Sequence, residues 1–314
     1  MPQRVHSAYA TLRSAETRDL LSNVGNTPLI SLRHVGPRNH DVRLLVKAEW
    51  FNPSGSVKAR SVLSIIETAE REGALTNGKT ILDSTSGNAG LAYAMIAAGR
   101  GYRVKLTIPR NMNAERKHLL RAYGAELVYT DPLEGSDGAI KRAREICAEN
   151  PASYFYADQY SNDANWKAHY ETTGQEIWNQ TGGSVTHFVA GIGTGGTLMG
   201  TGRRLRECNS EIQVIAVQPD SPFHGLEGLK HIPTSIKAGI YEPSFPDRIA
   251  EIGTEAAQRT VMELAKREGI LVGPSSGAAI AASLRIAEEI DEGTIVALLP
   301  ESGERYLSEK FWEE

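Results

Sequence analysis

The sequence predicts an α/β protein in which parallel sheets are covered by helices on both faces. Short apolar runs alternate with amphipathic helical patterns through most of the 314 residues, which is the pattern of βα repeats. Glycine follows several of the helical patterns, as at Gly73, Gly124 and Gly269, where a helix would end. The length allows one large or two medium domains, and we expect two sheets with a break near Asn150-Pro151.

The predicted elements follow one another in regular order. The expected strands are Leu44–Ala48, Thr80–Asp83, Arg103–Ile108, Glu126–Tyr129, Tyr154–Ala157, His187–Ala190, Gln213–Val217 and Thr294–Leu299. The expected helices are Ser61–Glu72, Ala89–Ala98, Ala114–Tyr123, Ser136–Glu149, Trp166–Gln180, Leu198–Glu207, Thr254–Glu268 and Ala278–Glu288. In such a fold, ligands bind outside the carboxyl ends of the strands, so the turns there are the first places to look for function.

Composition and charge exclude several classes of protein. The net charge of −4 and the lack of a basic face argue against nucleic-acid binding. No apolar run reaches the length of a membrane span, and the polar start of the chain does not resemble a signal peptide. Cys147, Cys208 and the histidines show no metal-ligand spacing, so we expect no metal site. Two free thiols and no targeting segment predict a cytoplasmic protein.

The segment Asn52–Lys58 places a lysine after a Pro/Ser/Gly turn, where a strand passes into a helix. A helix N-terminus is a positive environment, which favours the uncharged amine of Lys58. An uncharged lysine can attack an aldehyde and form an imine.

The next turn, Asp83–Gly90, joins a strand to an alanine-rich helix and contains Thr85, Ser86 and Asn88. Its hydroxyls and backbone N–H groups can bind a carboxylate or a phosphate, although the same residues are common helix caps.

The glycine-rich turn Gly191–Thr197 follows the strand at His187–Ala190 and is the strongest anion-binding signal in the chain. Gly191, Gly193 and Gly196 also fit the dinucleotide pattern, with Asp220 near the end of the next strand, so dinucleotide binding stays open at this point.

Two further turns follow later strands, at Gly273–Gly277 and at Pro300–Tyr306. Since all four turns lie at the carboxyl ends of predicted strands, they can converge on one small phosphorylated ligand. Gln159 also follows a strand end, but by itself it fits a polar surface loop.

Taken together, these strings resemble one known family. The order N-P-S-G-S-V-K, T-S-G-N, G-T-G-G-T, S-S-G-A-A and S-G-E-R-Y is similar to the cysteine synthase (O-acetylserine sulfhydrylase) and cystathionine β-synthase family of fold type II pyridoxal-phosphate enzymes. The resemblance covers nearly the whole chain. It argues against dinucleotide binding, because a dinucleotide site gives Lys58 no role. It implies two three-layer α/β domains of the tryptophan synthase β type with the cofactor in the cleft between them. The smaller, mobile domain would comprise residues 42–151 and the larger one residues 1–41 plus 152–314.

The resemblance also implies a role for each motif residue. Lys58 would hold pyridoxal 5'-phosphate as an imine and move the substrate's α-proton. Asn88 would bond the ring hydroxyl, Ser275 would contact the ring nitrogen, and the substrate carboxylate would be bound by Thr85, Ser86, Asn88 and Gln159. The cofactor phosphate would be bound by Gly193, Thr194, Gly195, Gly196 and Thr197. A neutral serine at the ring nitrogen, near a helix N-terminus, makes the ring a weak electron sink.

The implied activity is β-substitution, in which an O-activated serine and a sulfur nucleophile give L-cysteine by way of α-aminoacrylate. O-acetylserine is the favoured donor. O-phosphoserine stays open as a donor because Lys230, His224 and His231 lie in the loop after Val217. The same resemblance also allows a cystathionine β-synthase, a serine or threonine dehydratase, or a non-catalytic relative that binds a partner.

The family also implies a homodimer, with serine acetyltransferase or a sulfur-carrier protein as a partner. The chain departs from the family pattern at Ala59, where aspartate is common, and at Ala89, where threonine is common. The second departure removes a hydroxyl from the expected carboxylate pocket.

Overall fold

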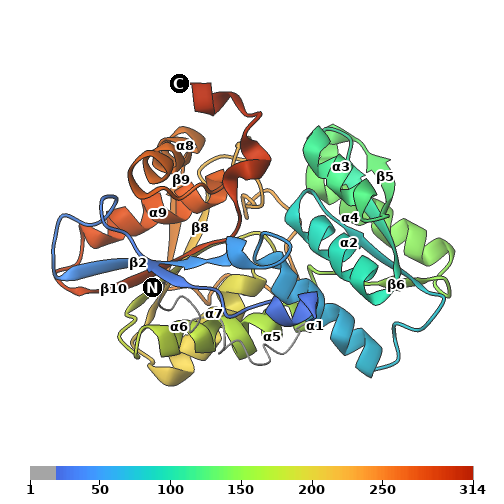
Figure 1. Cartoon of the computed structure of the whole chain (residues 1–314), viewed down its shortest axis with the longest axis horizontal. Helices are drawn as coiled ribbons and strands as arrows, with labels where there is room; N and C mark the ends of the chain where they lie inside the picture. The colour runs from blue at the N-terminus through green and yellow to red at the C-terminus, as the bar shows by residue number, and fades with distance from the viewer. Residues whose placement is uncertain (1–18, 314) are drawn as a thin grey trace, which may run out of the picture.

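The computed structural model describes residues 19–313 and contains two separate sheets (Figure 1). The six-stranded sheet has the order β1-β2-β10-β7-β8-β9, and the four-stranded sheet has the order β5-β4-β3-β6. All neighbouring strands are parallel except β1 and β2. The strands are β1 Leu29–Ser31, β2 Val42–Ala48, β3 Thr80–Ser84, β4 Arg103–Pro109, β5 Glu126–Thr130, β6 Tyr154–Tyr156, β7 His187–Gly191, β8 Gln213–Pro219, β9 Arg248–Ile252 and β10 Gly293–Leu299.

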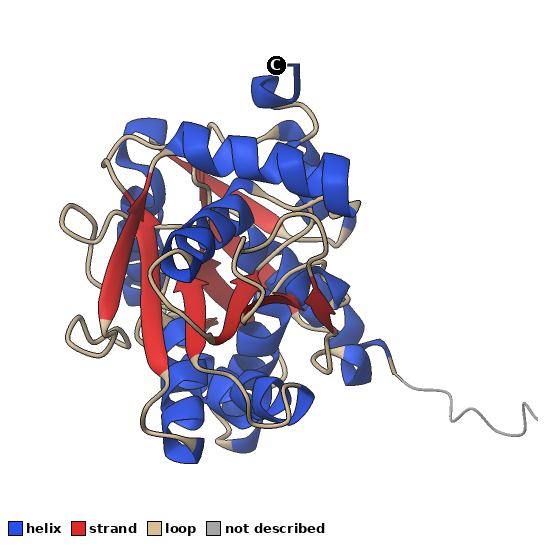
Figure 2. Cartoon of the chain, turned by 90° about the vertical axis from the view of Figure 1, so that its left-hand side faces the viewer, coloured by secondary structure: helices blue, strands red, loops and turns tan. Residues whose placement is uncertain are grey.

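Helices cover both faces of the six-stranded sheet, with α8 and α9 on one side and α5, α6 and α7 on the other (Figures 1 and 2). The α-helices are α1 Lys58–Arg71, α2 Asn88–Arg100, α3 Ala114–Ala122, α4 Gly135–Glu149, α5 Asp163–Ala168, α6 Gly174–Gln180, α7 Gly196–Cys208, α8 Thr254–Glu263 and α9 Pro274–Ala287. Helices α1 and α2 pack on one face of the four-stranded sheet, and Thr107 of β4 donates a hydrogen bond to Ala139 of α4 at 2.8 Å.

Successive side chains along a strand point to opposite faces of the larger sheet, so its apolar core forms two layers. In β7, Phe188 and Ala190 pack with α6 and α7, whereas Val189 packs with α8 and α9. A strand buried on both faces needs apolar residues at every position, which is why the strands read as continuous apolar runs in the sequence.

The predicted α/β class and its parallel sheets are confirmed, and the predicted strands and helices all form. The predicted helix Trp166–Gln180 is interrupted by a π-helical turn at His169–Thr173, and Thr254–Glu268 ends in one at Leu264–Glu268. Strands β1 and β9 were not predicted. Both are edge strands: β1 has only three residues, and β9 is mostly exposed, so neither has the apolar run of a central strand.

Sheet membership differs from the predicted domain boundaries at two strands. Residues 42–48 form β2, which pairs with β10 over its whole length in the six-stranded sheet. Residues 154–156 form β6, which pairs with β3 in the four-stranded sheet. Both assignments depend on pairing between distant segments, which the local pattern does not encode. Residues 1–18 of the predicted larger domain lie outside the described residues.

Within residues 19–313, every helix is too short or too polar to span a bilayer. Cys147 in α4 and Cys208 at the end of α7 are free thiols.

Candidate active site

The four turns predicted from the sequence converge on one cleft with two adjoining lobes. Lys58, Asn88, Gly193 and Thr194 line both lobes. The first lobe also contains Thr85, Ser86, Gln159, Arg116 and Lys230. The second contains Gly195, Thr197, Ser275 and Glu301. Gly196 is the one predicted site residue that lines neither lobe, because it forms the first turn of α7 behind the loop.

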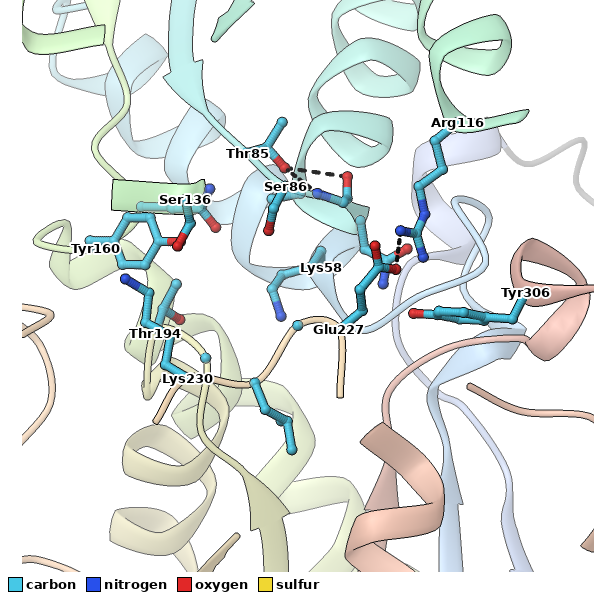
Figure 3. Close-up of a pocket in the computed structure, with 17 residues that line it drawn as sticks. Lys58, Thr85, Ser86, Arg116, Ser136, Tyr160, Thr194, Glu227, Lys230 and Tyr306 are labelled. Carbon is cyan, nitrogen blue, oxygen red and sulfur yellow. Dashed lines mark hydrogen bonds and ion pairs between the residues drawn. The ribbon is translucent and has the colours of Figure 1, made fainter. Parts of the chain in front are cut away.

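Lys58 is the first residue of α1, and its side chain lies between Thr85 and Ser86 on one side and Glu227 on the other (Figure 3). The turn before it is fixed by a hydrogen bond from Val57 N to the Pro300 carbonyl at 2.8 Å. Burial lowers the pKa of the Lys58 amine, and the nearby negative charge of Glu301 opposes this effect only in part. An amine with a lowered pKa is neutral more often near pH 7 and is therefore a better nucleophile and base.

The glycine loop after β7 can be built only from small residues. A Cβ on Gly193 would lie 2.4 Å from the Gly228 carbonyl oxygen, and one on Gly196 would lie 2.0 Å from Asn165 Oδ1. Gly195 has a φ of +86°, in the left-handed region that favours glycine. The loop therefore presents backbone at the start of α7, which is an arrangement that suits a phosphate.

Two threonines complete this loop. Thr194 Oγ1 accepts hydrogen bonds from Asn165 Nδ2 at 3.2 Å and from Gly196 N at 3.3 Å. Thr197 Oγ1 lies 3.3 Å from His169 Nε2. Burial lowers the pKa of His169 to about 3, so this imidazole is neutral at pH 7 and adds no charge to the loop.

The loop at the start of α2 is held in shape by Thr85. Its hydroxyl oxygen accepts hydrogen bonds from Gly87 N and Gly90 N, both at 3.1 Å. A Cβ on Gly90 would lie 2.5 Å from Thr85 Cγ2, so the close approach of helix and loop needs glycine there. Ser86 and Asn88 line the cleft beside it, and so does Ala89, which confirms that the residue lacking the family's hydroxyl faces the site.

Gln159 is buried rather than part of a solvated loop. Its Nε2 donates to the Ser84 carbonyl at 2.8 Å, which ties the end of β6 to the end of β3. Beneath this contact, Asp83 accepts hydrogen bonds from Ser84 N at 2.8 Å and Gln159 N at 3.4 Å. Burial raises the pKa of Asp83 to about 7.

Two ion pairs join the four-stranded part of the molecule to the loop that follows β8. Arg116 of α3 pairs with Glu227, as the dashed line in Figure 3 shows. Lys230 Nζ lies 2.8 Å from Asp137 Oδ1 of α4. Lys230 is only 6% exposed, so it is not the solvated lysine that a polar loop usually carries.

Sequence reasoning missed several residues that line the cleft. The sequence predicts the fourth turn, which contains Glu301 and Tyr306, but it assigns no role to these two side chains. Arg116 and Glu227 carry no local signal, because a charged residue on a helix or in a loop is usually solvated.

A partly buried amine beside a glycine loop that suits a phosphate and a polar loop that suits a carboxylate is the arrangement expected in one class of enzyme. It is one that holds a small phosphorylated aldehyde on a lysine and acts on an amino acid.

Comparison with known proteins agrees with this class. The family model described as "Pyridoxal-phosphate dependent enzyme" matches residues 20–301. The chain is 52% identical to a cysteine synthase of Aquifex aeolicus, over 92% of this chain and 90% of the relative. It is 43% identical to cysteine synthase B of Escherichia coli, over 92% and 94%. The crystal structure of a cysteine synthase of Entamoeba histolytica superposes with a TM-score of 0.90 at 37% identity, covering 99% of this chain and 95% of that one.

The chain therefore belongs to the family of pyridoxal-phosphate-dependent enzymes, and its cofactor is pyridoxal 5'-phosphate. The residues present fit that group: the amine of Lys58 suits the aldehyde, and the loop at Gly193 suits the phosphate. The dinucleotide hypothesis raised by the glycine loop is thereby set aside.

Proposed function

We propose that this enzyme makes L-cysteine by β-substitution, from O-acetylserine and a sulfur nucleophile. The observation that carries the proposal is the position of Lys58, where the phosphate loop and the Thr85–Asn88 loop meet. The curated relatives that match over nine tenths of the chain are named as cysteine synthases, which supports the same activity.

Each lobe of the cleft receives one part of the reactants in this proposal. In the cofactor lobe, Lys58 holds the aldehyde and Gly193–Thr197 bind the phosphate, while Asn88 and Ser275 contact the ring. In the other lobe, Thr85, Ser86, Asn88 and Gln159 bind the substrate carboxylate. Because the Thr85 hydroxyl is engaged by its own loop, its contribution is to hold the loop's N–H groups and the Ser86 hydroxyl toward the substrate.

Bound pyridoxal phosphate supplies an electron sink that acidifies the α-carbon of the substrate. Once the amino group of the substrate has taken the place of its own on the aldehyde, Lys58 is released as a free amine. Its Nζ then takes the α-proton, because its lowered pKa keeps a fraction of the amine neutral. The Cβ–oxygen bond then breaks and acetate leaves. The sulfur nucleophile forms the Cβ–sulfur bond, and Lys58 returns the proton to the α-carbon.

The charges around the substrate lobe favour acetate over phosphate as the leaving group. Arg116 and Lys230, the two cations that line this lobe besides Lys58, already have carboxylate partners, Glu227 and Asp137. A phosphate ester would add about two negative charges to these two neutral ion pairs, whereas an acetyl ester adds none.

Family membership also supports a proposal for the quaternary structure and the partners of this enzyme. We propose a cytoplasmic homodimer in which the unit built on β3–β6 moves and closes on the bound carboxylate. The partner proposed for the cleft entrance is either the C-terminal tail of serine acetyltransferase or a sulfur-carrier protein.

The test is a product assay on the purified holoenzyme with O-acetylserine and sulfide. The proposal predicts L-cysteine and acetate in equal amounts, and loss of both in Lys58→Ala. Lys266→Ala, which alters an exposed lysine outside the cleft, serves as the control. Pyruvate and ammonia in place of cysteine would show a dehydratase, and cysteine formed only from O-phosphoserine would overturn the choice of donor.

A further inference from the structure

His169 is a buried histidine beside the phosphate loop Gly193–Thr197, and the proposed chemistry gives it no role. Only 1% of the residue is exposed. It is the first residue of the π-helical turn His169–Thr173, which lies between α5 and α6. Such turns are rare and are found frequently at functional sites, so the contacts of this imidazole show what the turn does.

Each ring nitrogen of His169 lies next to one threonine hydroxyl. Nε2 lies 3.3 Å from Oγ1 of Thr197, the last residue of the phosphate loop, which lines the cofactor lobe. Nδ1 lies 3.0 Å from Oγ1 of Thr173, which is buried at the end of the same turn. The imidazole therefore bridges a hydroxyl that lines the cleft and a hydroxyl inside the protein.

The imidazole is neutral, so it has one N–H to donate. Burial lowers the pKa of His169 to about 3, and the positive charges of Arg60 and Lys58 act in the same direction. The negative charges of Glu49 and Glu176 oppose this shift only in part. A neutral imidazole carries its proton on one nitrogen and accepts a hydrogen bond at the other. The position of that proton decides the direction of both contacts with threonine.

Thr173 determines which nitrogen carries the proton. Within residues 19–313, His169 Nδ1 is the one hydrogen-bond partner of the Thr173 hydroxyl. A buried hydroxyl proton without an acceptor is costly, so Thr173 donates to Nδ1. The ring proton then lies on Nε2, and Nε2 donates to Thr197 Oγ1.

This direction leaves the Thr197 hydroxyl with its own proton to donate. A hydroxyl oxygen that accepts from the protein can still donate to a ligand. Thr194 has the same arrangement, because its Oγ1 accepts from Asn165 Nδ2 at 3.2 Å and from Gly196 N at 3.3 Å. Both hydroxyls of the loop are therefore available as donors to a phosphate dianion, which has acceptors and no donor.

Close packing fixes the imidazole between α7 and α1. A Cβ on Gly200 of α7 would lie 2.8 Å from His169 Cβ, so glycine is needed there for α7 to approach the π-helical turn. On the other side of the turn, Thr172 Oγ1 accepts a hydrogen bond from Arg60 Nη1 at 3.0 Å. Arg60 lies in α1, two residues after Lys58. The turn thus joins the helix that carries the cofactor lysine to the helix that begins at the phosphate loop.

We propose that His169 is a positioning residue for the cofactor phosphate: its Nε2–H donates to Thr197 and thereby holds the Thr197 hydroxyl with its proton directed at the phosphate. His169 lines neither lobe of the cleft, so it acts on the cofactor only through Thr197. The inference rests on the proposed function only for the position of the phosphate at Gly193–Thr197.

The first measurement determines the tautomer directly. Two-dimensional ¹H–¹⁵N NMR of the holoenzyme labelled with [¹⁵N]histidine shows which ring nitrogen is protonated, and the loss of its signals in a His169 variant assigns the residue. His169 is expected to show a protonated Nε2 and an unprotonated Nδ1. A proton on Nδ1, or on both nitrogens, overturns the proposal.

The second measurement compares the affinities for pyridoxal phosphate and for pyridoxal, which lacks the phosphate. His169→Asn has no N–H at the position of Nε2. It is expected to weaken binding of pyridoxal phosphate about tenfold, the effect of losing one hydrogen bond to a charged group, and to leave pyridoxal binding unchanged. His169→Gln, whose amide reaches the position of Nε2, is expected to recover most of the affinity. An equal loss for both ligands is the result of a general structural effect and overturns the proposal.

A double-mutant cycle tests whether His169 acts through Thr197. Thr197→Val removes the hydroxyl, so the further substitution His169→Asn is expected to cost no more affinity for pyridoxal phosphate. Additive losses, about a hundredfold together, contradict the proposal. His187→Asn serves as the matched control and is expected to keep wild-type affinity, because it breaks a similar pair, His187 Nδ1 with Thr186 Oγ1 at 2.8 Å, at the start of β7.

These results are separate from the proposed activity, because none of them depends on cysteine formation. Unchanged affinity for pyridoxal phosphate in His169→Asn overturns this inference and leaves the activity standing. Unchanged affinity in Thr197→Val also overturns it, and shows in addition that the phosphate lies elsewhere. The expected affinities in an enzyme that makes no cysteine contradict the activity alone.

Discussion

The buried carboxyl of Asp83 makes the stability of this enzyme depend on pH in a defined direction. Burial raises the pKa of Asp83 from 3.8 to about 7 in the folded chain. Between these values the folded protein holds a proton that the unfolded chain has released. The free energy of unfolding therefore falls as pH rises from about 4 to about 7, and above pH 7 the stabilising effect of this proton is lost.

The size of the effect follows from the two pKa values. Each pH unit contributes about 1.4 kcal/mol while the two states differ by one full proton. Because the folded state has itself lost about half of this proton by pH 7, the change is about 2 kcal/mol between pH 5 and pH 7 and about 3 kcal/mol between pH 5 and pH 8. Asp83→Asn removes the titration but keeps the side chain's size and its acceptor oxygen. Relative to wild type, the variant should gain about 3 kcal/mol of stability on going from pH 5 to pH 8.

Urea unfolding of both holoenzymes at pH 5, 6, 7 and 8, with saturating cofactor, measures this difference. Asp41→Asn, at an exposed carboxyl, serves as the matched control and should leave the pH profile of wild type unchanged. A constant difference between wild type and Asp83→Asn at all four pH values would refute the reasoning.

Three further substitutions test other parts of the structure. Gly193→Ala places a methyl group 2.4 Å from a backbone carbonyl and should weaken cofactor binding by roughly ten- to a hundredfold, the usual cost of overpacking, whereas Gly99→Ala, which meets nothing within 4 Å, should not; equal affinities by equilibrium dialysis would contradict this. Lys230→Ala should change kcat/KM for O-acetylserine and O-phosphoserine by the same factor, and a loss confined to O-phosphoserine would restore the phosphate hypothesis. Arg60→Ala leaves the fully buried Glu49 without its guanidinium partner at 2.7 Å and should lower the free energy of unfolding by about 3–5 kcal/mol; a loss under about 1 kcal/mol would show that the pair is dispensable.

The sequence predicts the positions of the four turns because their glycines, serines and threonines are local signals for strand ends and helix starts. Lys58 and the loop at Gly193 are of this kind, and the structure brings them into one cleft as expected. Only the family resemblance predicts Gln159 as a site residue. Its burial depends on the pairing of β6 with β3, which the local sequence does not show.

What the sequence could not supply depends on contacts between distant segments. The membership of β2 in the larger sheet requires β10, which lies about 250 residues later in the chain. The three side chains that donate hydrogen bonds to the Glu301 carboxyl come from α2, from α9 and from the turn after β10, and no local pattern connects them. Polar networks of this kind become visible only when the chain has folded.

The central claim is that the amine of Lys58 carries the cofactor, and one measurement addresses it directly. Borohydride reduction of the holoenzyme converts the carbon–nitrogen double bond between lysine and pyridoxal phosphate into a stable single bond, and peptide mass mapping then locates it. The account predicts a single modified peptide with the added mass on Lys58. A modification on another lysine, or none in a protein that still binds the cofactor, would contradict it.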